Sequence, residues 1–268
     1  MGVVNVTPDS FYDGGRHFDL RRAVDRAVEM VEEGADLIDI GGESTRPYST
    51  GIDEAEEKDR VLPVIEALAG KITPPISIDT KKPGVARAAL DAGAEIINDI
   101  SGMQADPDMI PLAAGTGAGV VLMHMRGTPE KMQLLTKYNN LIGEIKAELA
   151  AAAQACVQGG ISQPRIVLDP GIGFAKKAEQ NLEVIKRLDE FEELDYPLMI
   201  GTSRKTFIGS ALKHRSLDDT PDERLMASVA AASLAAFKGA HILRVHDVAA
   251  TRQSLAVADA VRDGRYSQ

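Results

Sequence analysis

Hydrophobic residues in this chain recur in short runs that alternate with longer amphipathic segments. Three of the short runs share one pattern: a Gly-Ala pair, a charged or titratable residue, two large aliphatic residues and a strong hydrogen-bonding side chain. They cover residues 34–39, 93–98 and 239–244. A glycine that ends a helix before a short apolar run predicts a helix-to-strand turn. The polar side chain that closes each run is therefore expected at the carboxyl end of a strand.

Five further apolar runs also end in polar residues, which brings the predicted strands to eight. These runs are 3–5, 76–79, 120–124, 166–169 and 198–201. Between most of them the apolar residues are spaced by three and four, the pattern of an amphipathic helix. The predicted helices cover residues 20–31, 53–69, 85–92, 138–157, 179–188, 222–237 and 248–261. The segment after Asp99 has the weakest helical pattern.

Strands that alternate with helices predict an α/β protein whose parallel sheet is covered by helices. Eight such units favour a closed (β/α)8 TIM barrel over an open doubly wound sheet. The length of 268 residues suits one barrel of this kind, so we expect residues 1–268 to form a single domain.

Composition excludes several classes of protein. A net charge of −10 argues against a nucleic-acid or membrane-surface partner. No apolar run approaches the roughly 20 residues that cross a bilayer, and no signal-peptide pattern opens the chain. Cys156 is the single cysteine, so no disulfide framework exists and we expect a cytoplasmic protein with an inert, buried thiol. Because a strand pattern begins directly after Met1, we also expect a few natural residues to precede it.

The helix predicted near the end of the chain has no polar face. Residues 225–237 are apolar on nearly all sides, whereas a helix on the outside of a barrel should have a wet face. This pattern predicts contact with a second subunit, in a homodimer formed through the 222–237 and 248–261 helices.

Seven side chains able to carry chemistry stand at the ends of the predicted strands. They are Asp39, Asp79, Asn98, Asp169, Lys205, Arg244 and His246. In parallel α/β proteins the carboxyl ends of the strands carry the active site, and unpaired buried charges there would be costly without a function. Carboxylates, an amide and cations together suit a flat heterocycle with N–H donors and acceptors, next to an anion.

Two long loops follow the first and second strands. Residues 5–15 and 41–51 mix glycine with hydroxyl side chains, and the second loop contains Arg46. This composition suits a mobile cover over an oxyanion ligand. The alternative is a pair of turn-rich loops whose Ser and Thr residues cap helices.

Other motifs carry less information. Zinc-ligand spacing, a G-x-S-x-G elbow and the dinucleotide-binding glycine spacing are all missing from the sequence. We interpret His124 as a hydrogen-bonded scaffold residue. The acidic run Glu54, Glu56 and Glu57 is interpreted as a solvated helix start favoured by the helix dipole.

Eight segments, taken in order, resemble the dihydropteroate synthase family over essentially the whole chain. They are residues 4–11, 39–47, 77–80, 97–101, 122–125, 169–174, 203–205 and 244–247. The resemblance implies a (β/α)8 barrel that joins p-aminobenzoate to 7,8-dihydropterin-6-ylmethyl diphosphate. The products are 7,8-dihydropteroate and pyrophosphate, in a step of folate biosynthesis that sulfonamides target.

The resemblance also implies a role for each matching residue. The pterin would contact Asp79, Asn98, Met123, Asp169, Phe174 and Lys205. The diphosphate would face Thr45, Arg46, Arg244 and His246. The p-aminobenzoate pocket would be bordered by Phe11, Pro47, Ser203 and Lys205, and Asn5 would contact Mg²⁺. Arg46, Lys205, Arg244 and His246 would be the catalytic residues. Tyr12 and Tyr48 depart from the small residues usual at these positions.

Three alternatives remain open. A methyltetrahydrofolate-binding barrel that transfers a methyl group to a corrinoid protein shares the pterin-binding Asp and Asn pattern. A non-catalytic pterin-binding paralogue would share the whole pocket. From residue chemistry alone, Lys205 also suits a Schiff-base aldolase.

Overall fold

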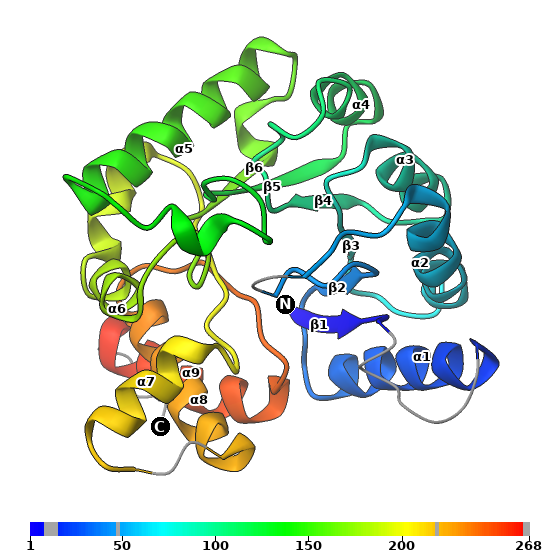
Figure 1. The fold of residues 1–268 in the computed structure, drawn as a ribbon. Helices are drawn as coiled ribbons and strands as arrows, with labels where there is room; N and C mark the ends of the chain where they lie inside the picture. The colour runs from blue at the N-terminus through cyan, green and yellow to red at the C-terminus, as the bar shows by residue number, and fades with distance from the viewer. Residues whose placement is uncertain (8–15, 47–48, 218–219, 265–268) are drawn as a thin grey trace.

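A computed structural model describes residues 1–7, 16–46, 49–217 and 220–264. Within them, eight short strands surround a common axis, and helices cover the strands on the outside (Figure 1). The strands are β1 (Gly2–Asn5), β2 (Ile38–Gly41), β3 (Ile76–Asp79), β4 (Ile96–Asp99), β5 (Gly119–Met123), β6 (Ile166–Asp169), β7 (Met199–Ile200) and β8 (Ile242–Leu243).

The strands close into a ring. β1 to β6 pair in parallel in sequence order, and β7 pairs in parallel with β8. Single parallel bridges join the two groups, one between Leu168 and Leu198 and the other between Gly2 and Val245. Across the second junction Val3 N donates to Val245 O at 3.0 Å. The predicted (β/α)8 barrel is therefore confirmed, with β7 and β8 as its shortest strands.

The described helices form the outer layer of the barrel (Figure 1). They are α1 (Arg16–Glu32), α2 (Glu54–Leu68), α3 (Pro83–Asp91), α4 (Met109–Thr116), α5 (Leu141–Gln158), α6 (Ala178–Lys186), α7 (Thr206–His214), α8 (Pro221–Phe237) and α9 (Val248–Asp263). Every predicted helix is present within a few residues of its expected ends, and the weak segment after Asp99 contains the short α4. Helix α7, which buries Phe207 and Ile208, was not among the predicted helices, although it is as long as α3 and α6.

The three repeated Gly-Ala segments form the same helix-to-strand turn. Gly34, Gly93 and Gly239 have φ of 93°, 115° and 100°, in the left-handed region that favours glycine. In the first repeat Ala35 N donates to Met30 O, and the alanines of the other two repeats donate to the corresponding carbonyls, five residues back. The turn delivers each chain into its strand, as the pattern predicted.

The core fills the space between the strands and the helices. One buried cluster runs from Val4 to Val248 and consists mainly of Ala, Val, Ile and Leu. Cys156 is fully buried in this layer, and burial raises the pKa of its thiol to about 11. The prediction of an inert core cysteine is confirmed. Within the described residues, no helix combines the length and the apolar character needed to cross a bilayer.

Helix α8 has two apolar faces. Ala232, Ala235 and Ala236 are buried, whereas Leu234 and Phe237 keep 59% and 48% of their surface exposed. On α9, Val257 and Val261 are exposed too. The outer surface of this helix pair therefore carries several exposed apolar side chains.

Candidate active site

The carboxyl ends of β2, β3, β4 and β8 meet in a buried cluster of charged and amide side chains. Arg244 Nε donates to Asp39 Oδ2 at 2.7 Å, and Arg244 Nη2 donates to Asp79 Oδ2 at 2.6 Å. Asn98 Nδ2 donates to the same Asp39 oxygen at 3.1 Å. The cluster joins residues that lie up to 205 positions apart in the sequence.

Burial and charge act against each other in this cluster. Burial raises the pKa of Asp79, the Arg244 guanidinium opposes this rise, and the neighbouring Asp39 carboxylate adds to it. Burial disfavours the charge on Arg244, but Asp39 and Asp79 outweigh it and raise the pKa of the guanidinium. Arg244 is therefore a permanent cation, and the buried Asp79 carboxyl holds a proton more readily than an exposed one.

Asp169 forms the opposite wall with residues that follow β6 and β7. Its Oδ1 accepts a 2.7 Å hydrogen bond from Gly171 N. Burial raises the pKa of Asp169, and the Lys205 ammonium and the Gly171 amide oppose this rise. Lys205 Nζ donates to Ile172 O and lies 4.8 Å from the centre of the Phe174 ring. Burial lowers the pKa of Lys205 to about 8, with Asp169 acting against the shift.

An apolar surface adjoins these polar groups. Met123 and Phe174 belong to one buried cluster with Ile100, Met132 and Ala175, separate from the main core. A pocket with an apolar wall and a buried carboxylate can hold a flat ring by its faces and its N–H edge together.

Asn5, Ser203 and His246 form a second group of polar contacts. Asn5 Nδ2 lies 3.4 Å from His246 Nε2, and His246 Nδ1 lies 3.1 Å from Ser203 Oγ. Burial lowers the pKa of His246 to about 4, and Arg244 adds to this effect. The neutral ring therefore accepts from Asn5 at Nε2 and donates to Ser203 at Nδ1. This assignment leaves the Asn5 amide oxygen available to a ligand.

The described part of the loop after β2 carries Thr45 and Arg46. Thr45 lies beside Asp79 at a small cavity, and Arg46 is exposed. Phe11 and Pro47, like Tyr12 and Tyr48, lie outside the described residues, so the predicted p-aminobenzoate contacts are represented by Ser203 and Lys205.

Four charged residues that were not predicted as site residues pair with one another next to this loop. Glu43 accepts from Lys81 Nζ at 2.7 Å and from Lys82, and Ile52 N donates to it at 3.3 Å. Lys82 also pairs with Glu57. Glu43 therefore fastens both ends of the loop that carries Thr45 and Arg46.

The interpretation of Glu57 as part of a solvated helix start is wrong. Its side chain is only 1% exposed, because α2 turns it inward onto Lys82. Glu56, in contrast, pairs with Arg60 at the surface, as expected of a solvated helix start.

His124 is a buried, hydrogen-bonded residue, as predicted. Its Nδ1 lies 3.0 Å from Lys176 Nζ and its Nε2 lies 3.0 Å from Glu148 Oε2. Lys176 was not predicted as a site residue, although it lies in the glycine-containing segment that follows β6. Its side chain is almost completely buried.

In the described part of the chain the acidic and histidine side chains are not grouped as metal ligands. Among the described residues, no group of three or more His, Cys, Asp or Glu side chains could hold a metal ion. The Asn5 amide oxygen is a suitable ligand for a hard cation, but a single protein oxygen fits an ion that takes its other ligands from phosphate and water.

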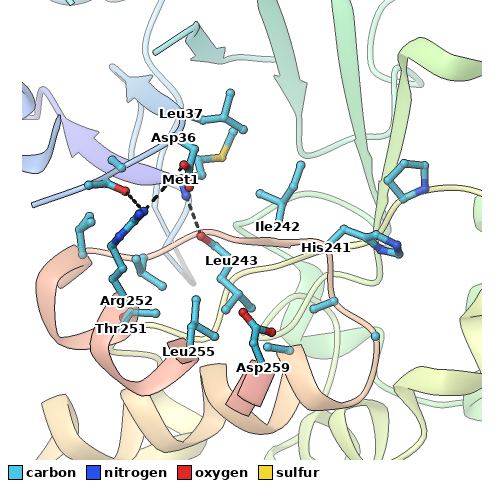
Figure 2. A pocket seen from close by; sticks show the side chains of 18 of the residues that line it. Met1, Asp36, Leu37, His241, Ile242, Leu243, Thr251, Arg252, Leu255 and Asp259 are labelled. Atoms are coloured by element: carbon cyan, nitrogen blue, oxygen red, sulfur yellow. Dashed lines mark hydrogen bonds and ion pairs between the residues drawn. The ribbon is translucent and has the colours of Figure 1, made fainter. Parts of the chain in front are cut away.

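A large cavity lies at the other end of the barrel. It has a volume of about 1020 Å³ and is lined by residues that precede strands, such as Leu37 and His241 (Figure 2). There the Met1 amine donates to Leu243 O at 3.0 Å. None of the predicted site residues that the structure describes lines this cavity. The predicted site residues instead converge at the carboxyl ends of the strands.

Comparisons with known proteins identify the family of the chain. The chain matches the pterin-binding enzyme family over residues 1–246. It is 46% identical to the dihydropteroate synthase of Synechocystis sp. over 97% of this chain and 89% of the relative. The structure of the Yersinia pestis dihydropteroate synthase with a sulfonamide drug complex matches with a TM-score of 0.90 and 43% identity, covering 98% of this chain and 93% of that one.

A second solved structure is the Xanthomonas albilineans dihydropteroate synthase in complex with 7,8-dihydropteroate. It matches with a TM-score of 0.86 and 42% identity, and covers 97% of this chain and 92% of the other. The sequence resemblance is thereby confirmed over the whole barrel. The chain belongs to the pterin-binding enzymes and, within them, to the dihydropteroate synthase family.

Proposed function

We propose that this protein condenses p-aminobenzoate with 7,8-dihydropterin-6-ylmethyl diphosphate to form 7,8-dihydropteroate and pyrophosphate. One observation carries the proposal: a buried carboxylate, Asp169, shares a wall with the Lys205 ammonium and the Phe174 ring at the carboxyl end of the barrel. The complexes of related synthases with 7,8-dihydropteroate and with a sulfonamide drug support it.

The pterin ring is held by its edge and its faces. The ionised Asp169 carboxylate accepts two parallel N–H bonds from the amino-pyrimidinone edge, each worth about 1.5–3 kcal/mol when charge-assisted. Asn98 already donates to Asp39, so its amide oxygen is the group left to accept from the ring. Phe174 and Met123 contact the faces. Asp79 and Lys205 complete the polar perimeter.

The reaction exchanges a C–O bond for a C–N bond at the pterin methylene carbon. The arylamine nitrogen attacks this carbon, the bond to the diphosphate breaks, and pyrophosphate leaves with the electron pair. The electron-rich ring stabilises positive charge on the methylene as the bond breaks. The proton of the arylammonium product is lost to water, so no strong general base is needed.

Cations at the mouth stabilise the leaving group. Arg46 and Arg244 supply charge, Thr45 supplies a hydrogen bond to the phosphate oxygens, and the neutral His246 holds Asn5 and Ser203 in place beside them. Mg²⁺ bound by the diphosphate, with Asn5 as its protein ligand, would neutralise further charge on the departing pyrophosphate. The bond from Asn5 Nδ2 to His246 orients the amide oxygen for that contact.

The p-aminobenzoate site lies on the side of Ser203 and Lys205. The same pocket takes sulfonamides, which resemble the arylamine. The Yersinia pestis complex supports this part of the proposal.

We extend the proposal to the assembly. Residues 1–268 act as one pterin-binding domain, and two copies associate through the exposed apolar residues of α8 and α9, including Leu234 and Phe237. The cytoplasmic location predicted from the sequence remains a prediction.

The decisive experiment measures pyrophosphate release when both substrates are mixed with the protein, with and without Mg²⁺, and identifies the pterin product by mass spectrometry. Release that requires both substrates and Mg²⁺ and yields 7,8-dihydropteroate supports the proposal. Pterin binding without release would identify a non-catalytic pterin-binding protein. A borohydride-trapped adduct on Lys205 would identify an aldolase.

A further inference from the structure

Lys176 is a buried lysine whose ammonium is fully occupied by three acceptors. Its side chain is 2% exposed. Its Nζ donates to Gly171 O, Phe174 O and His124 Nδ1, each at 3.0 Å. An ammonium has three hydrogens, so the described contacts satisfy all of them. A charge buried in this way needs a structural or functional reason.

Two of the three acceptors belong to the loop that shapes the pterin pocket. Gly171 has φ of 72°, its N–H donates to Asp169 Oδ1, and its carbonyl accepts from Lys176. A Cβ on Gly171 would come within 2.0 Å of His124 O, so the backbone is closely packed at this point. Gly171 therefore contacts both Lys176 and Asp169, so the position of Lys176 affects the orientation of the Asp169 carboxylate. Phe174, the other backbone acceptor, provides the apolar face of the pocket.

The third acceptor ties the loop to the outer layer. His124 accepts from Lys176 at Nδ1, so its proton lies on Nε2, which donates to Glu148 Oε2 on α5. Burial lowers the pKa of His124 to about 2, and the Lys176 charge adds to this effect, which agrees with a neutral ring. Arg126 pairs with Glu148 at the end of this chain of contacts.

We propose that Lys176 is a positioning residue of the pterin site, which fixes the loop after β6 so that Asp169 and Phe174 present their edge and face to the ring. This inference rests on the proposed function. It assigns Lys176 no contact with substrate. Its charge also lies close enough to Asp169 to favour the ionised carboxylate, the form that can accept two N–H bonds.

Several charged groups face this carboxylate. Lys205 after β7, Arg244 after β8 and Lys176 in the loop after β6 all favour the ionised form of Asp169. Burial lowers the pKa of Lys176 itself to about 7, and the groups that face it are Asp169, Lys205, Glu148 and Arg126, so its charge acts on Asp169 mainly below that pH. Removal of Lys176 therefore leaves two cations beside Asp169 but makes the carboxylate easier to protonate. As the pH is lowered, a variant without Lys176 should therefore lose pterin binding at a higher pH than the wild type does.

The test compares Lys176→Met with a matched control, Lys177→Met, whose side chain is exposed next to it in the sequence. Calorimetry measures the dissociation constant of 7,8-dihydropterin-6-ylmethyl diphosphate from about pH 5 to pH 8, and kinetics give KM for each substrate. We expect Lys176→Met to weaken pterin binding about 10-fold or more, to move the acid limit of binding to higher pH, and to change the KM of p-aminobenzoate far less. Lys177→Met should match the wild type.

Pterin affinity within twofold of the wild type at every pH would overturn the inference. An equal loss of affinity for both substrates, with the acid limit of pterin binding unchanged, would also overturn the inference, because that result would indicate a role in stability alone. If Lys176→Met does not fold, the pair His124→Asn and His124→Leu replaces it. The asparagine variant keeps an acceptor for Lys176 and should bind the pterin more tightly than the leucine variant, and equal affinities would overturn the inference. Failure of the wild type to bind the pterin would instead contradict the proposed function.

Discussion

Arg244 Nη2 donates a 2.6 Å hydrogen bond to Asp79 Oδ2 and so joins the last strand of the barrel to the third. The same guanidinium also donates to Asp39, so two carboxylates balance its charge before any ligand arrives. A diphosphate bound as proposed would therefore share the hydrogen bonds of Arg244 with Asp39 and Asp79. The charge of Arg46 in the loop after β2, in contrast, is exposed to the solvent from which the substrate comes.

Replacement of this exposed arginine should slow turnover without loss of pterin binding. Arg46→Ala removes one charge-assisted contact to the leaving group, so we expect kcat to fall about 10-fold or more at saturating substrates. Affinity for a pterin that lacks the diphosphate should stay unchanged. Arg87→Ala, an exposed arginine on α3, is the control. An unchanged kcat in the Arg46 variant would remove this residue from the reaction.

The ion pairs beneath the same loop predict an effect of Glu43. Its side chain is only 8% exposed and holds Lys81, Lys82 and the Ile52 amide, so it fixes both ends of the loop. Glu43→Gln keeps the shape but removes the charge, and we expect kcat/KM for p-aminobenzoate to fall several-fold while pterin affinity stays the same. Steady-state kinetics with Glu66→Gln, an exposed residue of α2, as the control would measure this. A lower Tm with unchanged kinetics would contradict a role in loop placement.

The apolar outer surface of α8 predicts a subunit contact. Leu234 and Phe237 leave about half of their surface exposed, which is costly in water unless another surface covers them. The double variant Leu234→Ala, Phe237→Ala should shift the protein from dimer to monomer in light scattering at micromolar concentration. Val157→Ala, an exposed apolar residue on α5, should leave the dimer intact. A double variant that remains fully dimeric would exclude this face as the interface.

The low pKa of His246 predicts a pH-dependent contribution to stability. Burial lowers this pKa from 6.5 to about 4, so between these values the unfolded chain binds a proton that the folded protein does not. The free energy of unfolding therefore loses up to about 1.4 kcal/mol per pH unit from this group as the pH falls from 6.5 to about 4.

Comparison with His246→Asn isolates this contribution. Burial raises the pKa of Asp99 and of Asp169, which changes stability in the opposite direction in both proteins. The difference in unfolding free energy between the wild type and the variant, measured in urea near pH 7 and pH 4.5, should shift in favour of the variant at the lower pH. A difference that is independent of pH would show that His246 titrates normally.

The fold was predictable because its signals are local. Each Gly-Ala repeat contains its own helix end, turn and strand, and the polar residue that closes the strand marks the face of the barrel. Asp39, Asn98 and Arg244 could be selected on this basis before any contact was known. Helix α7 was not predicted, although its nine residues match α3 and α6 in length.

The buried ion pairs could not be predicted in the same way. Glu57 opens α2 in an acidic run that favours solvation, and its burial depends on Lys82, 25 residues further along the chain. Lys176 is buried because His124, 52 residues earlier, supplies its acceptor. Pairings of this kind depend on how helices and loops pack around the barrel, which no local pattern specifies. The predicted contacts of Phe11 and Pro47 stay predictions, since both residues lie outside the described part of the chain.

Calorimetric titration of the pterin diphosphate into the wild type and into Asp169→Asn tests whether Asp169 binds the pterin ring. An amide at this position can accept only one of the two ring N–H bonds and turns a donor toward the other. We expect the pterin diphosphate to bind the wild type tightly and its affinity to fall about 100-fold or more in the folded Asp169→Asn variant. Near-normal affinity of Asp169→Asn would contradict this expectation, because the ring would then be held somewhere other than the mouth of the barrel.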